Sequence, residues 1–383
     1  MGATGSRNDL IELLKERESI SLSMNATPSL KSDRIHNEEC TYRLAFRMDA
    51  DNILRSKSYA RCSDKTQVVP LLSHDHIAHR ILHVQLVNSL SQTISEALGL
   101  NRDLVEAIAL GHDIGHPPFG HQGEELLSSL SIEHGNGPFA HPYQSCRQLT
   151  EVEPLNLSLQ VLDGILCHDG SLHSRINTPN RKKSWAEFQR EMVLKKSDPD
   201  CHLTPMTMEG ALVKICDTVS YLVQDLKDGI RLGLVNRSQI PDTLLGTSDE
   251  TILAEFSRHL IDASTQKDAI ILSEPLFAAI KQLRAFNFES IYFHPMVRRQ
   301  TQRIRRSYGL LFRWLIEDEQ HHREESYLWR EFLNNKSFNY IQKTSPIQRV
   351  VDFVAGMTDG YFIKTLERLF VPTEISWHSE VEY

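Results

Sequence analysis

The sequence of 383 residues lacks an apolar stretch of about 20 residues, the length that a helix needs to cross a bilayer. Its N-terminus also lacks the apolar core of a secretory signal peptide. No two cysteines form a Cys-x-x-Cys pair, and all six are widely scattered: Cys40, Cys62, Cys146, Cys167, Cys201 and Cys216. This spacing predicts neither a disulfide framework nor a zinc knuckle. We therefore expect a cytoplasmic protein with reduced thiols and no membrane partner.

An excess of basic residues, which is typical of general nucleic-acid-binding proteins, is also missing. The chain has 42 Lys and Arg against 50 Asp and Glu, which gives a formal net charge of −8. Any polyanion would therefore have to be bound by local basic groups. Global disorder is excluded as well, because the apolar content of 40% and the charged content of 24% are ordinary for a folded protein.

Helical periodicity dominates the sequence, whereas strand-like alternation is weak throughout. The prolines leave three long spans that favour long helices: 71–116, 206–240 and 296–345. Apolar residues of the first span recur at steps of three and four: Ile77, Ile81, Val84, Val87, Leu90, Ile94 and Leu98. Gly99 is expected to end that helix, Asn101 to cap the next one, and Ser345-Pro346 to begin another. The sequence therefore predicts a mostly α fold.

We expect three regions along the chain. Residues 1–41 would form an N-terminal helix and a polar segment, 42–235 a helical core, and 236–383 a C-terminal helical region packed on that core. Within the core, 170–206 is expected to be an irregular excursion with one short helix near 184–195. There is no internal repeat.

The C-terminal region carries a run of arginines followed by an acidic segment: Arg298, Arg299, Arg303, Arg305, Arg306, then Glu317, Asp318 and Glu319. One interpretation is a solvated helix face with salt bridges. The other is a face that binds anions or contacts another subunit.

The run that carries most information is GHDIGHPPFGHQGE, which follows an apolar helix. His112 and Asp113 at the end of that helix can both reach one metal ion, because imidazole offers nitrogen and carboxylate offers oxygen. The prolines and glycines then force a turn, which brings His116, His121 and Glu124 back near the same place.

Two further residues are candidate metal ligands on apolar helix faces. His83 is in phase with the core-facing stripe of the preceding helix. Asp217 is flanked by apolar residues of another helix, where an unpaired carboxylate is costly to bury and a metal would compensate its charge.

Each of these residues also has a structural interpretation. A buried histidine is more often a hydrogen-bonded core residue than a ligand, and His112-Asp113 could simply end a helix. His74, His76 and His79 crowd the same region and could form a competing cluster with His83.

The order of His, then His-Asp, then a distant Asp resembles the HD phosphohydrolase superfamily. The full run resembles the bacterial dGTPase-like deoxynucleoside triphosphate triphosphohydrolases. Other matching segments are Arg80 to His83, Lys65 to Val68, Val161 to Gly170, the helix with Asp217, Tyr221 and Asp225, Phe293-His294-Pro295, and Phe353 to Asp359. The likeness extends from about residue 42 to 371, so 42–235 would be the HD phosphohydrolase core.

The resemblance implies a metal-dependent enzyme of nucleotide metabolism that hydrolyses dGTP or several dNTPs to deoxynucleoside and tripolyphosphate. It implies a homo-oligomer and leaves a nucleotide effector open. The divalent metal, Mg, Mn or Fe, would be bound by His83, His112, Asp113 and Asp217.

The resemblance also implies substrate contacts. His121 would touch the α-phosphate region, with His116 on the same turn, and Arg80 would meet substrate phosphate. The residues facing the deoxyribose would be Gln67, Tyr221 and Asp225.

The proton donor to the leaving 5′-oxygen would be His141, oriented by Glu124. The sequence departs from the family there, because the family often has His-Asn-Ala-Gln-Ser where this chain has His-Pro-Tyr-Gln-Ser from His141 onward. Pro142 removes a backbone donor and puts the start of this helix in doubt.

Two other functions stay open. One is another HD-type nucleotide phosphohydrolase, acting on cyclic nucleotides or guanosine tetraphosphate; the Tyr221 and Asp225 helix argues against it. The other is a non-catalytic, HD-derived regulator that binds nucleic acid through the arginines at 298–306; the intact metal ligands argue against that. Without the resemblance, Tyr221 would be interpreted as a core aromatic and Asp225 as a surface charge.

Overall fold

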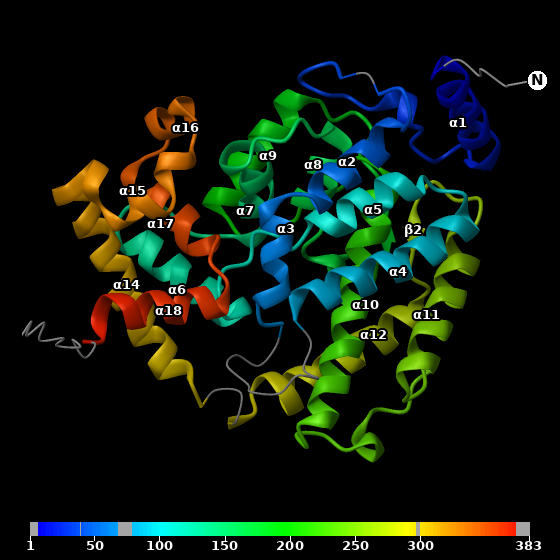
Figure 1. The fold of residues 1–383 in the computed structure, drawn as a ribbon. Coiled ribbons are helices and arrows are strands. Elements are labelled where there is room, and N and C mark those ends of the chain that lie inside the picture. The colour runs from blue at the N-terminus through cyan, green and yellow to red at the C-terminus, as the bar shows by residue number, and fades with distance from the viewer. Residues whose placement is uncertain (1–6, 39, 68–78, 296–298, 373–383) are drawn as a thin grey trace, which may run out of the picture.

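The structure is a computed structural model that describes residues 7–38, 40–67, 79–295 and 299–372, and it confirms the predicted mostly α fold (Figure 1). The longer helices are α1 (Arg7–Ser21), α2 (Ala45–Leu54), α3 (Lys57–Arg61), α4 (Arg80–Leu98), α5 (Arg102–Gly111), α6 (Gly120–Glu133), α7 (His141–Arg147), α8 (Leu159–Leu166), α9 (Trp185–Ser197), α10 (Met208–Arg231), α11 (Asp249–Ser264), α12 (Glu274–Asn287), α14 (Thr301–His322), α15 (Tyr327–Glu331), α16 (Phe338–Lys343), α17 (Pro346–Ala355) and α18 (Asp359–Phe370). Two short antiparallel strands, β1 (Ile176–Asn177) and β2 (Ile270–Ile271), pair with each other.

The predicted helix ends are confirmed where the structure describes them. Gly99 ends α4 in the left-handed conformation, with φ of 63°, and the Asn101 side chain accepts backbone N–H groups at the start of α5. Ser345 caps α17 in the same way, with Pro346 in its first turn. The short helix of the 170–206 excursion is α9. The predicted start at Ile77 lies outside the described residues, and α4 is described from Arg80 onward.

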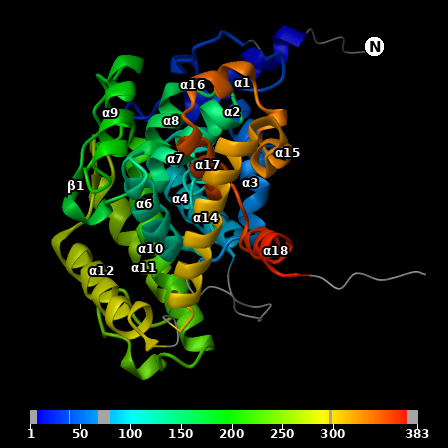
Figure 2. The same ribbon diagram turned by 90° about the vertical axis from the view of Figure 1, so that its left-hand side faces the viewer.

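Two hydrophobic cores hold the helices together, and they lie on opposite sides of Figure 1. The first core joins residues of α2, α4, α5, α8, α10, α11 and α12. The second joins α6 with α14, α15, α17 and α18, and Figure 2 shows α14 alongside α6. Ile114 belongs to the first core and Phe119 to the second. The histidine-rich turn therefore links the two cores. The predicted region boundaries stay a prediction.

None of the helices that the structure describes is both long and apolar enough to span a membrane.

Candidate functional site

The four predicted metal ligands converge on one place in the first core. α4 supplies His83, the end of α5 supplies His112 and Asp113, and α10 supplies Asp217. His83 Nε2 lies 2.9 Å from Asp217 Oδ1 and 3.7 Å from Asp113 Oδ2. His112 Nε2 lies 3.5 Å from Asp113 Oδ1 and 3.5 Å from Asp217 Oδ1. The structure therefore brings together residues that are up to 134 positions apart in the sequence.

The orientation of His112 fits a metal ligand. Its Nδ1 must donate to the carbonyl oxygen of Ala109, 2.7 Å away, because a carbonyl only accepts. In a neutral ring Nε2 then presents a lone pair toward the two carboxylates. This buried nitrogen has no hydrogen-bond partner among the described residues, nor has Nδ1 of His83. A ligating histidine commonly has one ring nitrogen fixed in this way, so the donors present could hold a divalent metal.

The electrostatics of this cluster favour a positive charge at its centre. Burial works against charge on His112, yet Asp113 and Asp217 outweigh it and raise the pKa of His112 to about 9. Burial alone would raise the pKa of Asp217, but the neighbouring His112 and His83 hold that pKa well below its usual range. A cation in this pocket would therefore meet two ionised carboxylates in a low-dielectric setting.

Gly115 allows α7 to pack directly on the His-Asp turn. A Cβ atom at this position would lie 2.3 Å from the carbonyl oxygen of His141 and 2.3 Å from the backbone nitrogen of Ser145. The hydroxyl of Ser145 accepts from Gly115 N–H at 2.8 Å and donates to the His112 carbonyl oxygen at 2.6 Å. This close approach places the start of α7, and hence His141, beside His112 and Asp113.

Glu124 and His141 form a pair joined by hydrogen bonds. Glu124 Oε1 lies 2.9 Å from His141 Nδ1 and accepts the backbone N–H of His141 at 2.7 Å. Burial would raise the pKa of Glu124, but the neighbouring His141 holds it well below its usual range. Pro142 does not displace the helix start, because it lies in the first turn of α7, where a backbone donor has no intrahelical partner anyway. The His116 ring stacks on the His141 ring, with centroids 3.8 Å apart.

His168 is a site residue that the sequence argument missed. It follows the C-terminus of α8, and its Nε2 lies 3.1 Å from Nε2 of His141. Its Nδ1 donates to the carbonyl oxygen of Ile165 at 2.7 Å, which repeats the bond that His112 makes at the end of α5. Burial, assisted by the charges of His112 and His141, lowers the pKa of His168 to about 4. The available signal was the second His-Asp pair, His168-Asp169.

Arg80, Gln67 and His121 surround the cluster in different environments. Arg80 is buried, pairs with Asp113 and donates to the carbonyl oxygen of Thr66. Gln67 is half-buried, and its Oε1 has no hydrogen-bond partner within the described part of the chain. His121 is the most exposed of these three residues, with 77% of its side chain exposed. Its Nδ1 lies 3.7 Å from Glu124 Oε2. The predicted phosphate and sugar contacts of these residues stay predictions.

Tyr221 and Asp225 lie on α10, one and two turns after Asp217. Asp225 is buried, so its interpretation as a surface charge is wrong. Tyr292 donates to its Oδ2, whereas Oδ1 has no partner among the residues described. Burial raises the pKa of Asp225 to about 7. Tyr221 is half-buried and hydrogen-bonds with Arg284, a second residue that the sequence argument missed.

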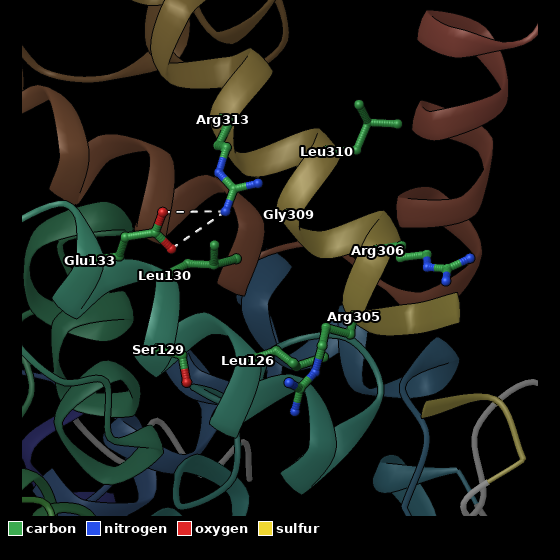
Figure 3. Close-up of a pocket in the computed structure, with 9 residues that line it drawn as sticks. All are labelled: Leu126, Ser129, Leu130, Glu133, Arg305, Arg306, Gly309, Leu310 and Arg313. Atoms are coloured by element: carbon green, nitrogen blue, oxygen red, sulfur yellow. Dashed lines mark hydrogen bonds and ion pairs between the residues drawn. The ribbon is translucent and has the colours of Figure 1, made fainter. Parts of the chain in front are cut away.

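A separate groove of about 550 Å³ lies between the later half of α6 and α14 (Figure 3). Its lining includes Arg305, Arg306 and the exposed Leu310, together with Arg313, which pairs with Glu133 at 3.2 Å. Arg305 and Arg306 belong to the predicted arginine-rich face, whose Arg298 lies outside the described residues. Anion binding and subunit contact at that face stay predictions.

Comparison with protein families places the chain in a class. The HD domain model matches residues 80–222, which include His83, His112, Asp113 and Asp217, and a phosphohydrolase-associated domain matches residues 270–368. The fold is therefore that of an HD-domain phosphohydrolase.

Curated relatives narrow this class. A deoxyguanosinetriphosphate triphosphohydrolase-like protein of Caldanaerobacter subterraneus is 32% identical over 94% of this chain and 96% of its own length. A protein of the same name from Desulfatibacillum aliphaticivorans is 31% identical over 94% of this chain and 98% of its own. The chain belongs to this family of deoxyguanosinetriphosphate triphosphohydrolase-like proteins, which confirms the resemblance. Among solved structures, a hypothetical protein from Aquifex aeolicus covers 84% of this chain and 71% of its own with a TM-score of 0.40 and 18% identity, too distant to carry an argument.

Proposed function

We propose that this protein hydrolyses deoxynucleoside triphosphates, dGTP or several dNTPs, to deoxynucleoside and tripolyphosphate in a metal-dependent reaction. One observation carries the proposal: the cluster of His83, His112, Asp113 and Asp217 lies directly beside the bonded pair of Glu124 and His141. Family membership supports nucleotide phosphohydrolase activity, and the names of the relatives make dGTP the first substrate to test.

The histidine and aspartate cluster suits attack on a polyphosphate. Triphosphates carry about four negative charges, which repel an incoming nucleophile; a divalent ion, if bound here, would polarise the α-phosphoryl oxygen and make a water more acidic. We assign the ligand roles to His83, His112, Asp113 and Asp217. Arg80 pairs with Asp113 and holds it in place. Its positive charge could also contact a phosphate oxygen of the substrate. His121 and His116 lie on the adjacent turn, where they can contact the α-phosphate region.

The hydrogen-bond pattern leaves a proton available on His141. His168 donates through Nδ1 to a carbonyl, so its Nε2 accepts, and His141 must donate to it through Nε2. His141 also donates through Nδ1 to the carboxylate of Glu124. In this arrangement Nε2 of His141 is therefore a hydrogen-bond donor. The alcohol-like 5′-oxygen is a poor leaving group, and we assign its protonation to Nε2 of His141.

Discrimination against ribonucleotides is assigned to Gln67, Tyr221 and Asp225. Asp225 lies eight residues beyond Asp217 on α10, about 12 Å along the helix axis. Its unpartnered Oδ1 can accept a hydrogen bond from the 3′-hydroxyl of a deoxyribose bound beside α10, and Tyr221 can pack against C2′ of that sugar. A 2′-hydroxyl would clash with Tyr221 and would be a buried donor without a partner. We expect this to favour deoxynucleotides over ribonucleotides by about 1–3 kcal/mol, or roughly 10–100-fold.

A product-resolved assay tests this function. The four dNTPs are supplied singly and in pairs, with and without a chelator, and products are separated by chromatography. We expect deoxynucleoside and tripolyphosphate without initial orthophosphate, and activity that the chelator abolishes. Faster hydrolysis of one dNTP in the presence of a second dNTP would identify the second as a nucleotide effector. A dNDP or dNMP as primary product would contradict the proposal and favour another HD-type phosphohydrolase.

Substitution of Asp217 tests the metal assignment in the same assay. Asp217→Ala should lose metal content and activity together, because the pocket loses one of its two carboxylates that face His112. The matched control is His134→Gln, which changes a half-buried histidine at the end of α6, outside the cluster. A folded Asp217→Ala protein with full metal content and activity would refute the ligand assignment.

A further inference from the structure

His141 and Glu124 come from helices that belong to different cores. α7 begins at His141 and places Cys146 in the first core. α6 carries Glu124 and places Leu127 in the second core. The hydrogen bonds between His141 and Glu124 therefore cross the boundary between the two cores. A small shift of one core against the other would lengthen the 2.9 Å contact between His141 Nδ1 and Glu124 Oε1.

A second connection between the cores lies on α7 itself, within two turns of His141. Asp352 of α17 is fully buried, with an exposed fraction of 0%. Its Oδ1 accepts from the side-chain amide of Gln144 at 3.0 Å. Both of its oxygens also accept from the guanidinium group of Arg147, at distances between 2.7 and 3.0 Å. Because Phe353, the next residue of α17, belongs to the second core, Asp352 joins α7 to that core.

Two further donors hold Asp352 from the side of the second core. The hydroxyl of Tyr340 on α16 donates to Oδ2 at 2.7 Å, and the side chain of Gln348 on α17 donates to Oδ1 at 2.9 Å. An ionised carboxylate only accepts hydrogen bonds, and a charged acceptor forms stronger ones than a neutral acceptor. The carboxylate of Asp352 is therefore fixed by α16 and α17 on one side and holds α7 on the other.

α7 depends on such contacts because it is short. It has seven residues, and a helix of this length is not stable in isolation, so its position is set by the elements around it. Gly115 packs against the start of the helix, at the carbonyl oxygen of His141. Asp352 holds the later part of the helix, up to Arg147 at its end. Contacts at two places along the helix fix its direction as well as its distance from the His-Asp turn.

We propose that Asp352 is a positioning residue for His141: through Gln144 and Arg147 it holds α7 so that the ring of His141 meets Glu124. This inference rests on the proposed function, which assigns protonation of the leaving 5′-oxygen to His141. That proton moves only in the transition state. Loss of the positioning should therefore lower kcat and leave KM unchanged.

Two substitutions that each remove one hydrogen bond from the same carboxylate separate positioning from stability. Gln144→Met keeps a side chain of similar length but breaks the bond between α7 and Asp352. The matched control is Tyr340→Phe, which keeps its ring and breaks a bond on the side of the second core only. Hydrolysis of dGTP is assayed well below the lowest unfolding temperature of the wild type and the two variants.

The expected results differ between these variants. Gln144→Met should lower kcat by about tenfold or more and keep KM within about twofold of the wild type, because a misplaced catalytic group slows the chemical step. Tyr340→Phe should keep both constants within about twofold at a similar loss of unfolding temperature. Equal kcat values in the two variants, or a KM of Gln144→Met that rises as its kcat falls, would contradict the proposal.

Nuclear magnetic resonance of ¹⁵N-histidine-labelled protein reads the placement of His141 without activity. This measurement uses the same two variants, since replacing Asp352 itself would leave the buried charge of Arg147 without its partner and can prevent folding. His141→Gln identifies the ring signals of His141 by their loss. Gln144→Met should shift these signals and Tyr340→Phe should not, because only the first loosens the contact with Glu124. Unchanged signals in Gln144→Met would overturn the proposal.

The two proposals fail in distinguishable ways. If no dNTP yields tripolyphosphate but Gln144→Met shifts the signals of His141, the proposed function is wrong and the positioning role stands. If tripolyphosphate is released but Gln144→Met has the kcat and the histidine signals of Tyr340→Phe, the positioning role is wrong and the function stands.

Discussion

The buried carboxyl of Asp225 should destabilise the folded protein, and Asp225→Asn should relieve that effect in a pH-dependent way. Burial raises the pKa of Asp225 from 3.8 to about 7. A raised carboxyl pKa means that the folded state holds the proton more tightly than the unfolded state. The penalty is therefore full above pH 7, shrinks as the pH falls, and disappears below the unfolded pKa. From these two values it is roughly 4 kcal/mol at pH 8 and roughly 2 kcal/mol at pH 5.

Urea unfolding of wild type and Asp225→Asn at pH 8 and pH 5 measures this difference. The amide keeps an oxygen for the Tyr292 hydroxyl but carries no charge. We expect the variant to be more stable by roughly 4 kcal/mol at pH 8 and by about half of that at pH 5. The control Asp262→Asn changes an exposed carboxylate on α11 and should show no such dependence. An equal difference at both pH values would refute the reasoning. The same variant should lower kcat/KM for dGTP and GTP alike, which would show that the carboxylate is kept for binding.

Further substitutions address the acid pair, the sugar pocket, the packing of the turn and assembly. Glu124→Gln and His141→Ala should each lower kcat by about 10²–10⁴ without changing metal content; a normal rate for His141→Ala would move the proton donor elsewhere. Tyr221→Ala should narrow the ratio of kcat/KM for dGTP over GTP. Gly115→Ala should lower the unfolding temperature, with a loss of about 1–3 kcal/mol or more from the backbone clash, whereas Gly309→Ala in a helix interior should be neutral or stabilising. Light scattering should show a homo-oligomer, and a stable, fully active monomer would exclude it.

The sequence predicted local structure well because local structure depends on neighbouring residues. Gly99, Asn101 and Ser345 end or begin helices where their side chains or conformations dictate. Burial of His83 followed from its phase with an apolar stripe. These features need only the periodicity and the capping chemistry of one helix, both of which are visible in a single segment.

The pairing of His141 with His168 could not be predicted in the same way. It depends on the distance between the ends of two helices, which tertiary packing sets. α7 reaches the His-Asp turn only because Gly115 has no side chain, and the sequence does not say which backbone approaches a given glycine. The burial of Asp225 was equally invisible, because the residue that covers it, Tyr292, lies 67 positions away.

The C-terminal helices are part of the site although they supply none of its predicted ligands. Lys65 is buried and donates to the carbonyl oxygens of His116 and, at 2.9 Å, of Ala355 at the end of α17. Asp359, the first residue of α18, accepts the backbone N–H of Phe119 at 3.0 Å. Hydrogen bonds at the His116 carbonyl oxygen and the Phe119 N–H thus tie this turn, through Lys65 and Asp359, to the end of α17 and the start of α18. Because a site built from rigid neighbours holds its side chains in place, we infer that the C-terminal region positions this turn. These contacts come from Ala355 and Asp359, both within residues 270–368, the stretch that matches the phosphohydrolase-associated domain.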